Sequence, residues 1–208
     1  MRSPNASAPI FVDSSEGISG TKAALIQAIL QSVAKPLPIN TVRQLTLPPQ
    51  SSTTTLLTTL GITAPSVVLR NVLPTGTMVG VVHTSTSQSP FFIFAVGAAY
   101  AATFSGMLSW EPTLLRDMKS LFPLYPEPAP IVTASSTSAT STAQKLISVP
   151  KIVFRDEVVS NHDVRVYRDA QGRSIVLYGY WDPQTLVIAR DPAAFTEILA
   201  RLATPHTK

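Results

Sequence analysis

The sequence predicts an α+β fold, in which antiparallel β-hairpins and a meander pack against amphipathic helices. Short apolar runs rich in β-branched and aromatic residues stand in pairs with polar turns between them, which is typical of hairpins. Segments with apolar residues at helical spacing follow these runs. A long segment rich in Ser, Thr and Pro separates two such sets. With 208 residues, the chain can bury a sizeable core without disulfides.

Composition and charge exclude some classes of function for this protein. Charged residues make up 13% of the chain, about half the usual share of roughly 25%. The net charge is +4, and Lys and Arg form no cluster. Nucleic-acid binding requires a concentrated basic face, so we expect no nucleic-acid partner. The absence of cysteine excludes thiol catalysis and thiolate metal sites.

A long uncharged run in the middle of the chain could be a membrane span or a buried core. Its first part, "TMVGVVHT" and "PFFIFAVG" joined by polar residues, favours two strands of a hairpin. The residues after Gly97 have helical periodicity and continue past the run to about residue 119. We therefore expect a core hairpin followed by a long helix. Its predicted buried stripe is Ala101, Phe104, Leu108, Leu115 and Met118, with Met107 and Leu114 beside it.

The rest of the N-terminal half, residues 10–122, follows a flexible lead at 1–9. Thr21 is the expected N-cap of its first helix, and Gly61 is expected just beyond the end of a short helix. Pro112 either kinks the long helix or begins a new segment. The expected elements are a strand at 9–13, a helix at 19–35, a strand at 41–47 and short helices at 51–61 and 64–74.

The C-terminal half, residues 151–208, follows a linker or long loop at 123–150. Its composition predicts a three-stranded meander closed by a helix with Asp191 as N-cap and Pro192 at its first position. We expect the two halves to pack in one body, although two lobes are an alternative. The predicted strands are at 164–169, 173–182 and 185–190.

Polar residues around 156–163 are the candidates for chemistry. Paired carboxylates could act as acid and base or bind a hard cation. However, Asn, His and Asp before a strand more often form turns, and the spacing of a calcium loop is missing. We therefore predict no catalytic, cofactor-binding or metal-binding residue. The candidates are Asp156, Glu157, Asn161, His162 and Asp163.

Aromatic residues of the second half form a possible interaction surface: Tyr167, Tyr178, Tyr180 and Trp181. Tyr178 and Tyr180 share one face of a strand, and an exposed face would bind protein or glycan. The interpretation as core is favoured, because the sheet must cover the helix at 192–203. Trp110 is likewise expected to pack at the helix edge, and Glu111 is expected to pair with a nearby Arg or to cap a backbone group.

Two blocks carry a family resemblance. "FSGMLSWEPTLLRDMKSLFP" and the region from "SNHDVRV" to "TLVI" resemble a family of uncharacterised bacterial proteins. The resemblance implies an ectodomain that follows a single membrane-spanning anchor in the cell envelope, with no known activity. That anchor is not in this sequence. The matching residues are Phe104, Gly106, Met107, Leu108, Trp110, Glu111, Asp117, Leu121 and Phe122, then Asn161, Asp163, Arg165, Val166 and Thr185 to Ile188.

The expected function is therefore a non-enzymatic, extracytoplasmic domain with a structural, assembly or protein-binding role. Its partner would be another protein or a second copy of the chain, and it would meet the membrane only through an anchor. One alternative is a hydrolase or metal-assisted enzyme that uses the carboxylates at 156–163. Another is a peripheral membrane protein that uses the apolar run at 91–108.

Overall fold

The computed structural model describes residues 8–48, 56–126 and 152–204, and these segments have the predicted α+β fold. The strands are β1 (Ser14–Gly17), β2 (Thr41–Thr46), β3 (Met78–His83), β4 (Gln88–Ala95), β5 (Phe154–Val159), β6 (His162–Arg168), β7 (Ser174–Asp182) and β8 (Thr185–Ala189). The helices are α1 (Ala23–Ala34), α2 (Leu56–Leu60), α3 (Ser66–Asn71), α4 (Tyr100–Asp117) and α5 (Pro192–Ala203).

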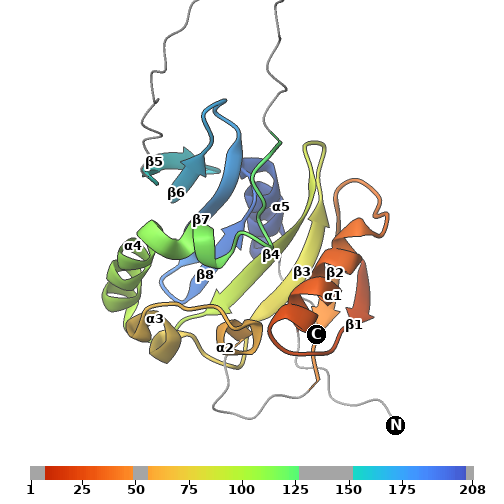
Figure 1. Ribbon diagram of the computed structural model, residues 1–208, viewed down its shortest axis with the longest axis horizontal. Coiled ribbons are helices and arrows are strands. Elements are labelled where there is room, and N and C mark those ends of the chain that lie inside the picture. Colours follow the sequence, from red (N-terminus) through yellow and green to blue (C-terminus); the bar gives the residue numbers. More distant parts are fainter. Residues whose placement is uncertain (1–7, 49–55, 127–151, 205–208) are drawn as a thin grey trace, which may run out of the picture.

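One eight-stranded sheet runs through both sequence halves (Figure 1). Its order is β1-β2-β3-β4-β8-β7-β6-β5. β1 and β2 are parallel, and all other neighbours are antiparallel. The halves meet where β4 pairs with β8, with Phe92 opposite Ile188. Both residues are buried, so the junction is part of the core.

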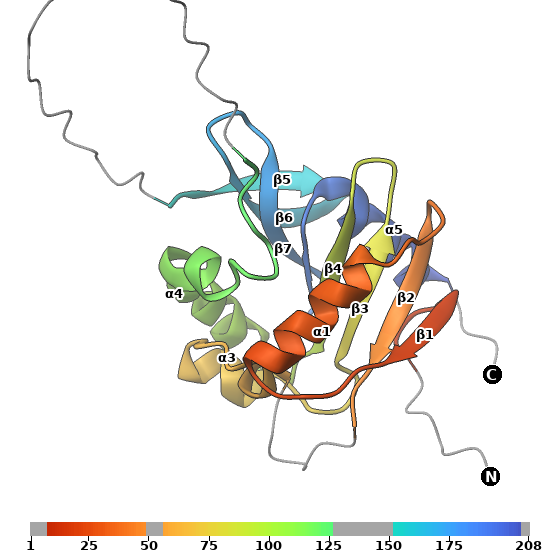
Figure 2. The same ribbon diagram turned by 45° about the vertical axis from the view of Figure 1, so that its right-hand side comes forward.

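Helices cover the two faces of the sheet unequally (Figure 2). One face is packed by α1 to α4 around a core that contains Ile29, Leu57, Val68 and Trp110. The other face is packed by α5 and by Ile10 of the N-terminal segment. Because successive residues of a strand point to opposite faces, each buried strand contributes to both cores.

The uncharged central run forms the predicted hairpin. β3 and β4 pair antiparallel, and Phe91 to Phe94 are each at most 1% exposed. The Phe91 ring lies over Gly80, where a side chain would collide with it at 2.6 Å. In the part of the chain that the structure describes, no helix is both long and apolar enough to span a bilayer.

The long helix is continuous through Pro112, and its predicted buried stripe is confirmed at Met107, Leu114, Leu115 and Met118 but is wrong in its N-terminal part. Ala101 and Leu108 of the predicted stripe are exposed. The burial is shifted because α4 also packs against α3, where Gly106 lets Val67 and Val68 approach closely. The buried residues of α4 are Thr103, Gly106, Met107, Trp110, Leu114 and Leu115.

Two N-terminal expectations are also wrong. The strand expected at 9–13 begins only at Ser14, because Asp13 turns its carboxylate onto the backbone N–H of Val42, at 2.8 Å. The N-cap of α1 is Lys22 rather than Thr21, and the Lys22 N–H donates to the Thr59 carbonyl. By contrast, the turn at Gly61 has the expected positive φ of 70°. The predicted lead at 1–9 and the start of the predicted helix at 51–61 lie largely outside the described residues.

The meander has four strands rather than three, because β5 joins it through a hairpin with β6. Ser160 and Asn161 form the two-residue turn with φ of 50° and 62°, the conformation that such hairpins require. The helix α5 begins as predicted: the Asp191 carboxylate accepts from the Ala194 N–H, and Pro192 follows the cap.

The first residues of the linker or loop predicted at 123–150 contact the meander. Pro123 accepts a hydrogen bond from Arg190, at 2.9 Å. The ring of Tyr125 lies 4.4 Å from the guanidinium carbons of both Arg190 and Arg173. These contacts fix the first residues of the predicted linker on the meander, because an aromatic face attracts a cation. The remainder of the prediction, from residue 127, lies outside the described residues.

Candidate functional site

A row of polar side chains crosses three strands of the meander on the face beneath α4. Asp156 of β5 is opposite Arg165 of β6, and Arg165 is opposite Tyr178 of β7. Residues directly opposite in an antiparallel pair point to the same face, so the three side chains lie side by side. Glu111 of α4 lies above this row and contacts Arg165 and Tyr178.

Glu111 and Arg165 form a two-pronged ion pair. Arg165 Nε donates to Oε1 at 2.7 Å, and Nη2 donates to Oε2 at 2.8 Å. The Tyr178 hydroxyl donates to the same Oε1 at 2.7 Å, and Arg165 Nη1 donates to Asp156 at 2.9 Å. Planar bidentate pairs of this kind are the strongest charge-assisted hydrogen bonds in proteins. The cluster therefore holds α4 to the meander across 54 residues of sequence.

The protonation states of this cluster are fixed by their surroundings. The hydrogen bond that Arg165 donates to Glu111 raises the pKa of Arg165 further above its already high value. Burial, followed by the interaction with Glu111, raises the pKa of Tyr178 well above 10. Tyr178 is 1% exposed. Arg165 thus stays charged and Tyr178 stays neutral. Their contacts with Glu111 therefore hold α4 to the meander and do not exchange protons.

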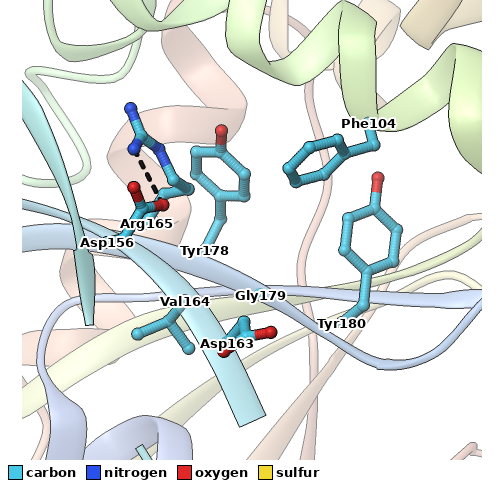
Figure 3. A pocket seen from close by; sticks show the side chains of 8 residues that line it. All are labelled: Phe104, Asp156, Asp163, Val164, Arg165, Tyr178, Gly179 and Tyr180. Carbon is cyan, nitrogen blue, oxygen red and sulfur yellow. Dashed lines mark hydrogen bonds and ion pairs between the residues drawn. The ribbon is translucent and has the colours of Figure 1, made fainter. Parts of the chain in front are cut away.

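A pocket opens beside the Glu111–Arg165 ion pair, between α4 and the strands β5 to β7 (Figure 3). It contains about 260 Å³ of empty space and opens to solvent on one side. Phe104 projects from α4 as its roof, and the meander supplies the other walls. The lining residues are Phe104, Asp156, Asp163, Val164, Arg165, Tyr178, Gly179 and Tyr180.

Phe104 and Tyr180 line the apolar side of the pocket, and the ring of Tyr100 packs against both. The ring of Tyr180 lies 4.9 Å from that of Tyr100 and 6.3 Å from that of Phe104. The Tyr180 hydroxyl is buried, and it has no hydrogen-bond partner among the described residues. Burial raises its pKa above the ordinary value of 10. A buried, unpaired hydroxyl costs free energy, so this part of the structure is not optimised for stability.

The polar candidates at 156–163 do not form one cluster. Asp156 and Asp163 both line the pocket. Glu157 points to the opposite face and pairs with Arg168 at 2.7 Å, which lowers the pKa of its carboxyl. His162 stacks on Trp181 on the side of α5. In the described ranges, no three His, Asp or Glu side chains are grouped as metal ligands would be.

The aromatic residues predicted as one interaction surface are divided between the faces of the sheet. Tyr178 and Tyr180 pack beneath α4, and Tyr167 joins the same core through Phe154. Trp181 points to the opposite face, because neighbouring residues of a strand alternate. The interpretation as core is therefore correct for Tyr178, but the covering helix is α4 rather than the terminal helix. The four residues do not form a single exposed platform.

The pairing of Glu111 with an arginine is confirmed, although the sequence did not identify Arg165 as its partner. The sequence analysis also did not place Phe104 in a pocket. One signal was available: both resemblance blocks contribute to the pocket, Phe104 from the first and Asp163 and Arg165 from the second. Two motifs that are far apart in the sequence and contain charged residues are candidates for contact with each other in the fold.

Comparison of the chain with models of protein families, with curated proteins and with solved structures finds no match. The resemblance to membrane-anchored bacterial ectodomains therefore stays a prediction.

Proposed function

We propose that this chain is a non-enzymatic binding domain of the cell envelope, and that it docks a partner protein over the pocket between α4 and β5–β7. One observation carries the docking site: a rim of exposed apolar side chains lies beside residues that line the pocket. The resemblance to anchored ectodomains supports the extracytoplasmic location. Partner proteins are recognised by such arrangements, in which a pocket receives one anchoring side chain and the surrounding surface excludes water.

The rim consists of Tyr100, Leu108 and Val158. Tyr100 and Leu108 are each 39% exposed, and Val158 is 70% exposed. Val158 is opposite Asp163 in the β5–β6 ladder, so it lies at the mouth of the pocket. Leu108 follows Phe104 by one turn of α4. Exposed apolar side chains gathered at a pocket are a feature of interaction sites.

The hydrolase alternative rests on the two carboxylates that share the pocket, Asp156 and Asp163. Asp156 is engaged by Arg165, and its side chain is 88% exposed. An acid–base pair needs one carboxyl with a raised pKa, which burial usually supplies. The peripheral membrane alternative needs an apolar run facing lipid, whereas Phe91 to Phe94 are buried within the sheet. Both alternatives are therefore weaker than docking of a protein.

The test is selection of binding peptides from a random library displayed on phage, against the full chain. We expect the recovered peptides to lose at least about tenfold in affinity on Leu108→Ser or Val158→Ser, since each change removes apolar contact area. Ile39→Ser is the matched control, because Ile39 is 60% exposed and lies in the loop before β2. Peptides that are insensitive to both rim variants would contradict the proposed site.

Analytical ultracentrifugation of the same variants separates the two kinds of protein partner. A monomeric wild-type chain supports docking of a different protein. A wild-type dimer that dissociates on Val158→Ser would instead show that the rim joins two copies, and it would overturn the proposal of a different partner.

A further inference from the structure

We propose that the pocket between α4 and β5–β7 binds the ammonium group of a lysine side chain presented by the partner protein. This inference rests on the proposed docking function and names the chemistry of the anchoring side chain. Three features of the pocket carry it: its excess of negative charge, its aromatic walls, and the number and arrangement of its unused acceptors.

The charge around the pocket is negative, although the chain as a whole is positive. Glu111, Asp156 and Asp163 contribute three carboxylates, and Arg165 contributes one guanidinium, which leaves two negative charges uncompensated. Within the described residues, the Asp163 side chain has no ion-pair or hydrogen-bond partner. A cation from outside would compensate this charge and could reach both pocket carboxylates, because Asp156 and Asp163 are exposed.

The walls are suited to a cation with an apolar stem. The faces of Phe104 and Tyr180 line the pocket, and aromatic faces attract cations through the negative potential of the ring. Tyr100 extends this surface toward solvent through its contact with Tyr180. The methylene groups of a lysine stem would pack on these rings, while its ammonium group reaches the carboxylates.

The acceptors suit an ammonium better than a guanidinium. Asp156 and Asp163 come from two different strands, so they do not present the flat pair of oxygens that a guanidinium prefers. An ammonium has three donors that rotate freely on a single-bonded stem, so it can reach separate acceptors.

The pocket is smaller than the usual site for a whole small molecule. Its empty space of about 260 Å³ includes part of the open mouth. Pockets for whole small molecules usually measure about 300–1,000 Å³. The exposed apolar rim then contacts the residues on either side of the inserted lysine, which is why we assign the ammonium to a protein rather than to a free polyamine.

The inference is tested by NMR titration of the ¹⁵N-labelled full chain with Nα-acetyl-lysine-N-methylamide. We expect saturable shifts of the amide signals of Asp163, Gly179 and Tyr180. The norleucine analogue has the same stem without the ammonium and should give at most about a tenth of the affinity, because it forms no charge-assisted hydrogen bonds. Equal binding of the two probes would overturn the inference.

Two further probes distinguish other cations. Cadaverine tests a free polyamine, and the arginine analogue tests a guanidinium. Tighter binding of either one than of the lysine probe would overturn the assignment to a lysine side chain. Asp163→Asn should weaken binding of the lysine probe by about tenfold. The matched control is Glu197→Gln, which removes a carboxylate from α5 on the opposite face and should leave the affinity unchanged.

The outcomes for the inference and for the proposed function are separable. If peptides still require Leu108 and Val158 but the lysine probe does not bind, the docking function stands and the ammonium inference fails. If the lysine probe binds but no peptide depends on the rim, the pocket binds a cation and the docking function fails. Circular dichroism and thermal unfolding of each variant exclude loss of fold as the cause.

Discussion

The two faces of the same strands, β6 and β7, are packed in opposite ways. On the α5 face, Phe195 and Ile198 of the helix lie against Val164 and Leu177 in a dry apolar layer. On the α4 face, Glu111 meets Arg165 end to end through an ion pair. Two long side chains thus separate the backbones of α4 and β6. Beside the Glu111–Arg165 ion pair, the space between α4 and β6 forms the pocket.

The comparison shows how one sheet can carry stability on one side and a binding site on the other. The apolar face is closed so tightly that Gly179 has no room for a side chain: its Cβ would lie 2.9 Å from Phe195. The α4 face also has an apolar core, which includes Trp110 and Tyr178, and the ion pair adds directional bonds beside it. Five predictions test this division, from the largest expected effect to the smallest.

Phe195→Ala should cost the most stability of any change on these faces. The ring is fully buried against the sheet, and its removal leaves a cavity that the rigid strands cannot close. We expect a loss of about 3–5 kcal/mol in the free energy of unfolding, measured by urea denaturation. Phe11→Ala is a suitable control, because Phe11 is 60% exposed and should change stability by about 0.5 kcal/mol or less. A smaller loss in the free energy of unfolding for Phe195→Ala than for Glu111→Ala would contradict the proposal that the α5 face contributes more to stability.

Glu111→Ala should have the next largest effect. It leaves Arg165 partly buried with only the exposed Asp156 as its counter-charge and leaves the Tyr178 hydroxyl without its acceptor. We expect a loss of about 2–3 kcal/mol, below the roughly 3–5 kcal/mol seen for fully buried pairs.

Asp156→Ala is the matched control for this ion pair, because it removes the exposed carboxylate that binds the same arginine. We expect it to cost about 0–1 kcal/mol. The double change Glu111→Met with Arg165→Met should be less destabilising than Glu111→Ala, because the only charge it leaves unpaired is that of the exposed Asp156. A double variant that is the least stable of the three would show that the ion pair itself contributes net stability.

The local elements were predictable from the sequence because their signals lie within one short segment. The β3–β4 hairpin has two strand-like runs around a polar turn, and α5 has a capping Asp followed by Pro. The turn at Asn161 was expected from side-chain chemistry alone. Such features depend on neighbours within a few residues, so periodicity and turn propensity reveal them.

The site was not predictable, since it depends on contacts between distant segments. The pairing of β4 with β8 places the meander beneath α4, and nothing local to either strand specifies it. The buried side of α4 is set jointly by Gly106 against α3 and by the sheet, whereas the sequence pattern alone favoured a partly different stripe. As a result, the cover of Tyr178 was assigned to the wrong helix.

Gly179→Ala should perturb only the apolar face. Its Cβ would point toward α5, at 2.7 Å from Val164 and 2.9 Å from Phe195. We expect a loss of about 1–3 kcal/mol from overpacking. The chemical shifts of Phe195 should change more than those of Glu111 in NMR spectra of the variant. Larger changes at Glu111 would show that the two faces are coupled through the strand.

Alkaline pH should weaken the polar face but not the apolar face. In the unfolded chain a tyrosine has a pKa near 10, whereas burial and Glu111 raise the pKa of Tyr178 in the folded state. Between these two values the unfolded state loses the proton and the folded state keeps it. The free energy of unfolding should therefore fall by about 1.4 kcal/mol per pH unit above roughly pH 10 from this group. Tyr178→Phe should reduce that slope by this amount, and an unchanged slope would count against the buried hydrogen bond to Glu111.

Asp163→Asn should have the smallest effect on stability, although Asp163 lies on the same strand as Arg165. Its side chain is exposed and has no partner among the described residues, so the substitution breaks no contact there. It also removes a negative charge beside Asp156, which offsets any loss of solvation. We expect a change within about 0.5 kcal/mol by urea denaturation. A loss above about 1 kcal/mol would indicate that Asp163 has a structural role. A negligible effect on folding combined with a weakened lysine probe would show that the polar face keeps this carboxylate for a ligand rather than for the fold.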